Sequence, residues 1–122
     1  MEAIQLAQSL EALGNYVREK KVYETYYEAK TVYENLDQHS KTILAQAEIE
    51  VFNESKSVEV KLTQLEITRF ALTNKAYTDH LEALKIARKQ ANDALAVVKS
   101  IELRFEVLRS LNRHFEPQDK FL

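Results

Sequence analysis

Apolar residues recur at steps of three and four residues through the C-terminal part of the chain, from Tyr77 onward. Ten of the twelve positions of this repeat are apolar, and the exceptions are His80 and Asn112. In order, the positions are Tyr77, His80, Leu84, Ala87, Ala91, Ala94, Val98, Ile101, Phe105, Leu108, Asn112 and Phe115. A heptad repeat held over this length predicts one long helix with a coiled-coil-like seam.

Two residues predict the ends of this helix. Asn74 is a suitable N-cap because its side chain can accept from the first free backbone N–H groups. Pro117 lacks a backbone donor and therefore ends the pattern. We expect the helix over residues 75–114 and a tail over residues 115–122.

A second apolar stripe precedes Asn74 and predicts a long helix over residues 16–72. Its positions are Val22, Tyr26, Ala29, Tyr33, Leu36, Ser40, Ile43, Ala47, Val51, Glu54, Val58, Leu62, Leu65, Arg69 and Leu72. The polar run 53–57 is a candidate break in this helix. The alternation around Val58 and Val60 is a strand signal, but a helix is favoured because no turn residue for a hairpin lies between Leu62 and Leu65.

The N-terminal residues carry a short stripe of their own, formed by Leu6, Leu10, Leu13 and Val17. Gly14 and Asn15 follow, and glycine is the usual residue just past a helix end. We therefore predict a short helix over residues 2–13.

These elements predict an all-α fold in a single domain over residues 1–122. Its centre is a long antiparallel helical hairpin, coiled-coil-like and preceded by the short N-terminal helix. At the helical rise per residue, the first long helix would span roughly 85 Å and the second roughly 60 Å. The second helix therefore ends near residue 33 of the first, which leaves the tyrosine-rich segment before it without a helical partner.

Composition supports long helices, since the 122 residues include one glycine and one proline. Cysteine is absent, so the chain has no disulfide framework and no thiolate chemistry. No signal peptide or membrane-spanning run is recognisable, and the expected location is the cytoplasm. Twelve acids and eight bases occupy residues 1–74, whereas residues 75–114 hold five acids and eight bases. The first part of the chain therefore carries a net negative charge and the second a net positive charge. Such parts can form ion pairs within the molecule or between copies.

Candidate catalytic and metal-binding groups are sparse, so we expect a protein that is not an enzyme and binds no cofactor. None of His39, His80 and His114 lies in a metal-binding spacing with a second histidine or with a glutamate three residues earlier. His80 falls on the heptad seam and is expected to be buried and hydrogen-bonded. The glutamates lie mainly on the polar faces of the predicted helices, and no glycine-rich loop could hold a phosphate.

Two surfaces could meet a partner. The first is the tyrosine segment, whose candidate interface residues are Tyr16, Val22, Tyr23, Tyr26, Tyr27 and Tyr33. A second copy is the expected occupant, which would build a helical bundle. The alternatives are the N-terminal helix folded back over this face, and a foreign protein. The second surface is a basic face that could follow a nucleic-acid backbone, formed by Lys85, Arg88, Lys89, Arg104, Arg109 and Arg113.

The stretch from Lys56 to Arg113, which contains TNKAYTDHLEALKIARKQANDALAVVKSIELRFEVLRSLNR, resembles small helical proteins of bacteriophages found near phage recombination genes. The shared features are a short cap, an aromatic residue with HLEAL, an alanine-rich middle and alternating charges late in the helix. Asn74 to Ala76 departs from the Ser-Pro-Glu-like helix start of those proteins, and the tyrosine segment lies outside the pattern. The resemblance implies a phage accessory to DNA recombination or host takeover, acting in the bacterial host cytoplasm. It offers no catalytic residues.

Overall fold

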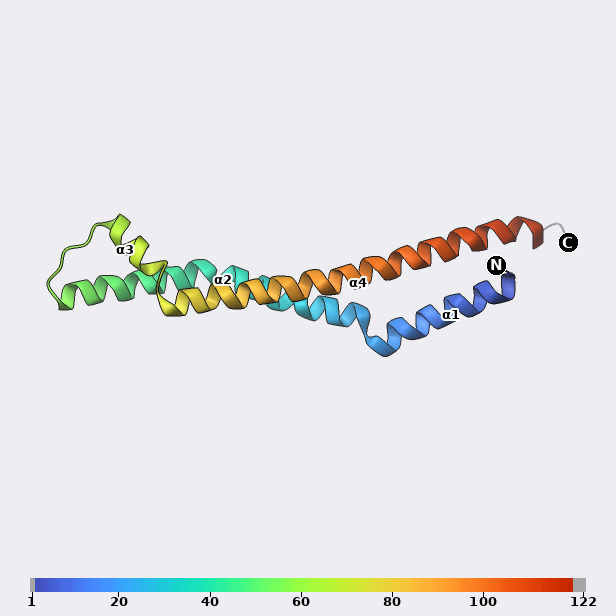
Figure 1. Ribbon diagram of the computed structural model, residues 1–122, viewed down its shortest axis with the longest axis horizontal. Helices are drawn as coiled ribbons and strands as arrows, with labels where there is room; N and C mark the ends of the chain where they lie inside the picture. Colours follow the sequence, from blue (N-terminus) through green and yellow to red (C-terminus); the bar gives the residue numbers. More distant parts are fainter. Residues whose placement is uncertain (1, 120–122) are drawn as a thin grey trace. The chain divides into compact units, whose positions relative to one another are not determined.

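The computed structural model describes the backbone of residues 2–119 and the side chains of residues 2–114. Four helices account for most of it: α1 (Ala3–Lys20), α2 (Val22–Ser57), α3 (Gln64–Ala71) and α4 (Lys75–Asp119), shown in Figure 1. No strand occurs in this described part of the chain. The all-α prediction is confirmed, and the strand alternative around Val58 is not adopted.

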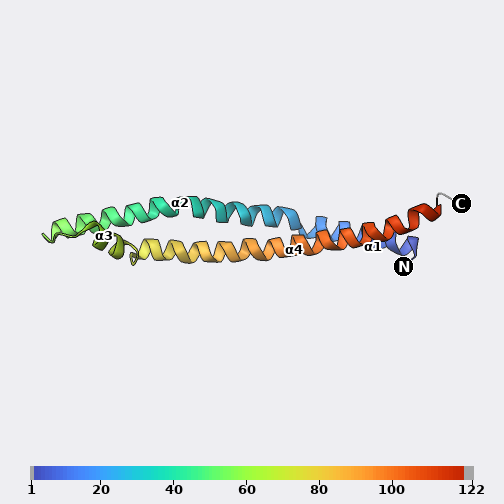
Figure 2. The same cartoon turned by 90° about the horizontal axis from the view of Figure 1, so that it is seen from above.

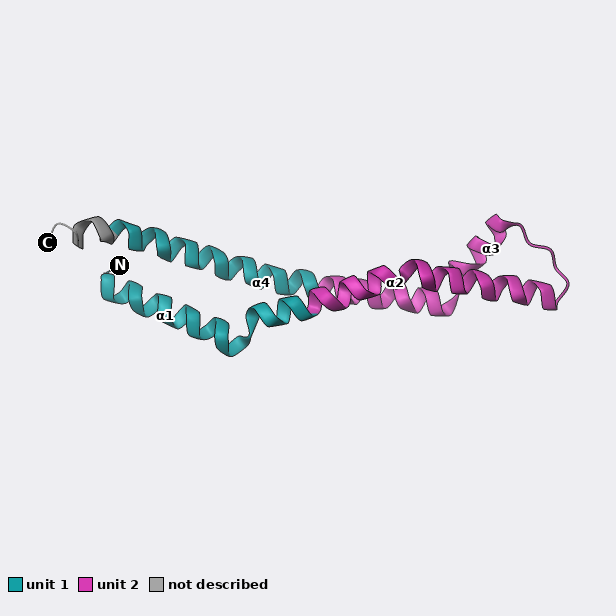
Figure 3. Cartoon of the chain, turned by 180° about the vertical axis from the view of Figure 1, so that it is seen from behind, with its two compact units in different colours: residues 1–28, 91–122 teal, residues 29–90 magenta. Residues whose placement is uncertain are grey.

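Where the sequence predicts one domain, the chain forms two compact units, coloured in Figure 3. Unit 1 consists of Met1–Glu28 with Ala91–Leu122, and unit 2 of Ala29–Gln90. Helices α2 and α4 each contribute residues to both units. The predicted hairpin partners therefore take part in both units.

Helix α1 is longer than predicted, because it continues through Gly14 and Asn15 to Lys20. Gly14 does not have a positive φ, whereas Lys21 adopts the left-handed conformation with φ of 48° and ψ of 49°. The Lys21 backbone N–H points back to the carbonyl oxygens of Val17 and Arg18, which satisfies the helix end. The predicted helix 2–13 was wrong in its C-terminus because a lysine, not the glycine, occupies the capping position.

Replacing Gly14 with alanine is expected to stabilise the chain by about 0.5–1 kcal/mol. A Cβ at this position would lie 3.8 Å from the Arg18 guanidinium, which is an ordinary contact. The gain comes from the smaller backbone entropy of the unfolded chain. Urea unfolding followed by circular dichroism measures it, and Ala12→Gly on the exposed side of α1 should lower stability by a similar amount. Equal midpoints for Gly14→Ala and the parent chain would contradict the expectation.

The long first helix predicted over residues 16–72 is interrupted at Lys21 and again over residues 58–63. The second break falls just after the polar run 53–57, which remains helical. Glu59 has a φ of 57°, and the Val60 N–H donates to the Ser55 carbonyl at 2.9 Å while the Glu59 N–H donates to Lys56 at 3.2 Å. This pair of bonds is a Schellman end, so α2 stops with its last carbonyls satisfied.

A reciprocal capping box starts α3. The Glu66 N–H donates to Thr63 Oγ1 at 3.2 Å, and the Thr63 N–H donates to Glu66 Oε1 at 3.2 Å. The helix then buries Ile67 and Ala71. The predicted stripe through Leu65, Arg69 and Leu72 is wrong here, because the break shifts the phase of the helix and leaves those three side chains exposed.

These capping bonds hold the pKa of Glu66 below its ordinary value, first through the Thr63 N–H and then through the Thr63 hydroxyl. A lowered folded pKa means that the contribution to stability is present at neutral pH and is lost as pH falls through the folded pKa. The Thr63 amide proton shift, followed by NMR, should therefore titrate with a midpoint below the pKa of an ordinary glutamate. Glu66→Gln keeps an acceptor for the bond and should abolish this titration. A midpoint at or above the ordinary glutamate value would contradict the capping role.

Helix α4 begins as predicted, with Asn74 as its N-cap. The Asn74 side-chain oxygen accepts from the Ala76 N–H at 2.9 Å and from the Tyr77 N–H at 3.4 Å. The predicted end at residue 114 was wrong, since the helix continues through Pro117 to Asp119. Proline disfavours but does not forbid the helical conformation of the preceding residue, and a loss of one donor does not end a helix already formed.

The predicted heptad seam agrees with burial along α4. Every seam residue from Tyr77 to Leu108 is buried or half-buried, whereas Asn112 is exposed and the position of the Phe115 side chain lies outside the described residues. In unit 2, α2 and α4 lie side by side and run in opposite directions (Figure 2), and the buried residues include Ala47, Leu84 and Ala87. Small side chains in this core let the two helices approach closely.

The core of unit 1 brings three segments together: α1, the first turns of α2 and the C-terminal half of α4. Its buried residues are Leu13, Val22, Val98 and Ile101. Packed around them are Val17, Tyr23, Tyr26, Phe105 and Leu108. Leu13 and Val17 belong to the stripe predicted for the N-terminal helix, and the seam of α4 supplies the opposite side.

Candidate interaction surface

Most of the tyrosine segment is in contact with other residues of its own chain. Val22, a predicted interface residue, is only 6% exposed, and Tyr23 and Tyr26 are half-buried against the core of unit 1. In unit 2, Tyr33 accepts a hydrogen bond at its hydroxyl from Arg88 Nε at 3.3 Å, with the guanidinium over its ring. The prediction that this segment lacks a helical partner was wrong, because α4 supplies contacts in both units.

The alternative in which the N-terminal helix covers the tyrosines is met in part, because α1 shares the core of unit 1 with Val22, Tyr23 and Tyr26. In unit 1, Leu13 of α1 lies in one buried cluster with Val22 of α2 and with Val98 and Ile101 of α4. Of the predicted interface residues, Tyr16 and Tyr27 remain exposed. The ring of Tyr27 lies 5.4 Å from that of Tyr26, measured between centroids.

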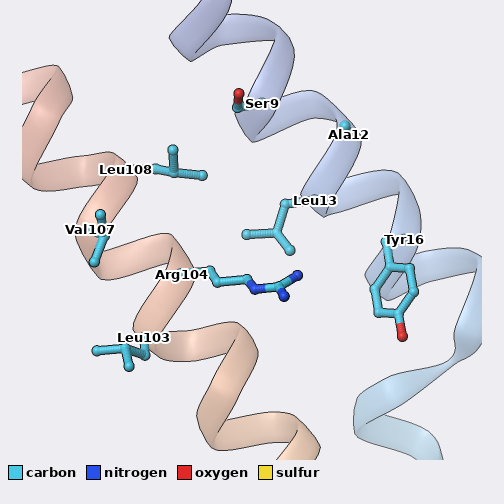
Figure 4. A pocket seen from close by; sticks show the side chains of 8 residues that line it. All are labelled: Ser9, Ala12, Leu13, Tyr16, Leu103, Arg104, Val107 and Leu108. Carbon is cyan, nitrogen blue, oxygen red and sulfur yellow. The ribbon is translucent and has the colours of Figure 1, made fainter. Parts of the chain in front are cut away.

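An apolar groove of about 600 Å³ opens between α1 and α4 in unit 1 (Figure 4). Its lining consists of Ser9, Ala12, Leu13, Tyr16, Leu103, Arg104, Val107 and Leu108. In Figure 4, Arg104 and Leu108 extend toward α1, whereas Leu103 and Val107 lie at the outer rim of the groove on α4. Tyr16 is the one predicted interface residue that takes part in this groove.

Leu103 and Val107 are large apolar side chains that are 61% and 52% exposed. They continue a row that also includes Ala96 and Ser100, both exposed, at steps of four, three and four residues. We call these four residues the outer seam of α4. Residues at this spacing share one helix face, so α4 carries a second heptad row outside its buried one. The spacing is present in the sequence. Sequence reasoning missed the row because two of its four residues are alanine and serine, which are also common on solvent-exposed helix faces.

The six basic residues of the predicted nucleic-acid face are divided between the two units. Lys85, Arg88 and Lys89 belong to unit 2, and the other three belong to unit 1. No ion pair within 4.0 Å joins any of the six to an acidic side chain among the described residues. Arg109 instead lies over the Phe105 ring, with its guanidinium carbon 5.8 Å from the centroid. Within residues 2–114, pairing of these bases with acidic residues of the same chain is therefore not formed, and pairing between copies stays a prediction.

His80 is 7% exposed, and its Nε2 lies 2.8 Å from Ser40 Oγ across unit 2. This confirms the prediction of a buried, hydrogen-bonded histidine on the seam. His39 is exposed, and its Nδ1 lies 2.6 Å from the Asn35 carbonyl oxygen, one helical turn earlier. Within the described residues, no three histidine, aspartate or glutamate side chains converge in a way that could hold a metal ion.

Among the described helices, none has a stretch long and apolar enough to cross a membrane. The surface features of the chain are thus an apolar groove, an exposed outer seam and dispersed bases. Compared with known proteins, the chain matches no family model, no curated protein and no solved structure.

Proposed function

We propose that this protein is a non-enzymatic interaction or structural accessory that works by self-association through a helical surface. The observation that carries the proposal is the exposure of Leu103 and Val107 beside the apolar groove of unit 1. Full burial of one such side chain is worth about 1.5–3 kcal/mol. An exposed set of this kind on a small chain is typical of a protein–protein contact.

The proposed contact differs in place from the one predicted from sequence. Val22, Tyr23 and Tyr26 are engaged within unit 1, and Tyr33 is engaged within unit 2. Because these side chains make contacts in their own chain, most of the tyrosine surface is not available to a second copy. The groove and the outer seam take its place, with Tyr16 at their edge.

In this proposal the chain acts as an antiparallel, coiled-coil-like helical hairpin that assembles into a larger helical bundle. Side-by-side packing of α2 and α4 in unit 2 supports this architecture. The resemblance of the stretch from Lys56 to Arg113 to small phage proteins supports a role as a phage accessory to DNA recombination or host takeover.

Light scattering of the full chain over a range of concentrations tests the proposal. We expect the apparent mass to rise above that of the 14.2 kDa monomer as concentration increases through the micromolar range. A constant monomer mass up to high micromolar concentration would contradict self-association. Circular dichroism on the same samples checks that the chain is helical, so that a monomer mass is not due to unfolding.

A second candidate function, nucleic-acid binding, is favoured because the six basic residues form no ion pair within 4.0 Å with the acidic side chains that the structure describes. Lys85 and Lys89 lie one turn apart, as do Arg109 and Arg113. Unpaired bases of this kind bind phosphates with an affinity that falls steeply with salt. Fluorescence anisotropy with labelled single- and double-stranded DNA and RNA at low salt tests this function, and an unchanged signal would remove it.

A further inference from the structure

We infer that the outer seam of α4 docks against the outer seam of a second copy in antiparallel orientation. The inference rests on the proposed self-association and specifies its surface and register. Its basis is the combination of an exposed heptad row with one particular arrangement of charges on its flank. Each of the residues involved lies in unit 1.

The outer seam alternates small and large side chains. In chain order it reads Ala96, Ser100, Leu103 and Val107. If two seams cross antiparallel with Leu103 opposite the partner's Ser100, then Val107 falls opposite the partner's Ala96. Each large side chain then meets a small one, which is how facing helices fill space without voids or clashes.

The flank of the seam selects this register. Lys99 and Glu106 occupy equivalent positions beside the seam, one heptad apart. In antiparallel helix pairs, this flank of one helix faces the same flank of the other. With Leu103 opposite the partner's Ser100, Lys99 lies beside the partner's Glu106, and symmetry repeats the pair.

Other arrangements place like charges together. A shift by one heptad sets Leu103 opposite the partner's Val107, and it brings Glu106 beside the partner's Glu106. A parallel pair in register sets Lys99 near the partner's Arg104, since the opposite flanks then face each other. Like charges repel each other across an interface, so both of these arrangements are disfavoured. The antiparallel pair with Leu103 opposite the partner's Ser100 is favoured.

Both charged side chains are exposed, and neither forms an ion pair within 4.0 Å among the described residues. They are therefore free to pair across two copies. Leu103 and Val107 are exposed at the rim of the open groove between α1 and α4, so a second copy can reach both side chains. A second copy thus fits the shape and the charge of this face.

Charge reversal tests the register. Lys99→Glu alone should weaken the dimer about tenfold in Kd, because both symmetric pairs become repulsive. Glu106→Lys alone should do the same. The double variant restores opposite charges and should return the Kd to within about threefold of the parent value. Sedimentation equilibrium gives these constants, and circular dichroism confirms that each variant stays helical.

Mixing the two single variants gives a sharper result. The Lys99→Glu chain carries glutamate at both flanking positions, and the Glu106→Lys chain carries lysine at both. One copy of each forms two attractive pairs, so the mixture should dimerise more tightly than either variant alone. Tighter association by Lys99→Glu alone would favour the parallel arrangement and overturn the inference. Unchanged association in all three variants would overturn this surface while leaving self-association in place, whereas a monomeric parent chain would overturn both.

Discussion

Ile101→Ala is expected to lower the free energy of unfolding of unit 1 by about 2–5 kcal/mol. Ile101 is 3% exposed and lies in the core formed by Leu13, Val22 and Val98. Truncation removes three methyl or methylene groups from this core and leaves a cavity that the surrounding helices can fill only in part. Native-state hydrogen exchange should show faster opening of the amides in residues 3–20 and 91–110.

Leu103→Ala is the matched control, because it removes a similar volume from the same helix two residues away. Leu103 is largely exposed, so its truncation in the monomer should change stability by no more than about 0.5 kcal/mol. The measurement is made at low protein concentration, where docking of a second copy does not contribute. Equal losses for the two variants would contradict the assignment of the core to the Ile101 face of α4.

The seam of α4 could be predicted from the sequence because its burial follows one uninterrupted helix. Positions from Tyr77 to Leu108 keep a heptad spacing, and Asn74 carries a recognisable cap. The burial of His80 was predicted from its place in this row. A helix packed along its length needs an apolar side chain on the buried face of each turn, so its sequence shows a regular apolar repeat.

Helix ends could be predicted less well. Lys21 and Glu59 both take the left-handed conformation, which glycine adopts most easily. Neither residue signals a break, whereas Gly14 signals one and lies within α1. The Thr63 and Glu66 pair was a readable start signal, but the apparent stripe continuing past residue 58 concealed it.

The error in helix ends produced the wrong prediction that the tyrosine segment has no helical partner in its own chain. A break placed at Gly14 and an unbroken helix to Leu72 gave two helices of unequal length, with the tyrosines unpaired. In the structure, the break after α2 and the short helix α3 place the start of α4 beside α2, where Asn74 Nδ2 donates to Glu50 Oε2 at 3.0 Å. Residues of α4 before position 114 therefore contact the tyrosine segment within each unit. Sequence periodicity identifies which residues share a face, but only the positions of the breaks determine what that face meets.

The hydrogen bond between Ser40 and His80 is expected to give unequal single-variant effects in unit 2. In the Ser40→Ala variant, Nε2 of a 7% exposed histidine loses its partner, at a cost of about 1–3 kcal/mol. In His80→Leu, the Ser40 hydroxyl keeps an acceptor in its own helix, the Leu36 carbonyl at 3.4 Å. The leucine also fills most of the space of the imidazole, so this variant should lose less than Ser40→Ala.

The double variant separates the hydrogen bond from the packing. Once His80 is leucine, removal of the Ser40 hydroxyl leaves no buried group without a partner, so the double variant should be about as stable as His80→Leu alone. The coupling energy from urea unfolding of the four chains should then be about 0.5–3 kcal/mol. Additive losses would mean that water replaces either partner without penalty, and the pair would then contribute little to the stability of unit 2. A coupling in the expected range would instead show that His80 depends on Ser40 for its burial, because serine has a second acceptor in its own helix and histidine has none among the described residues.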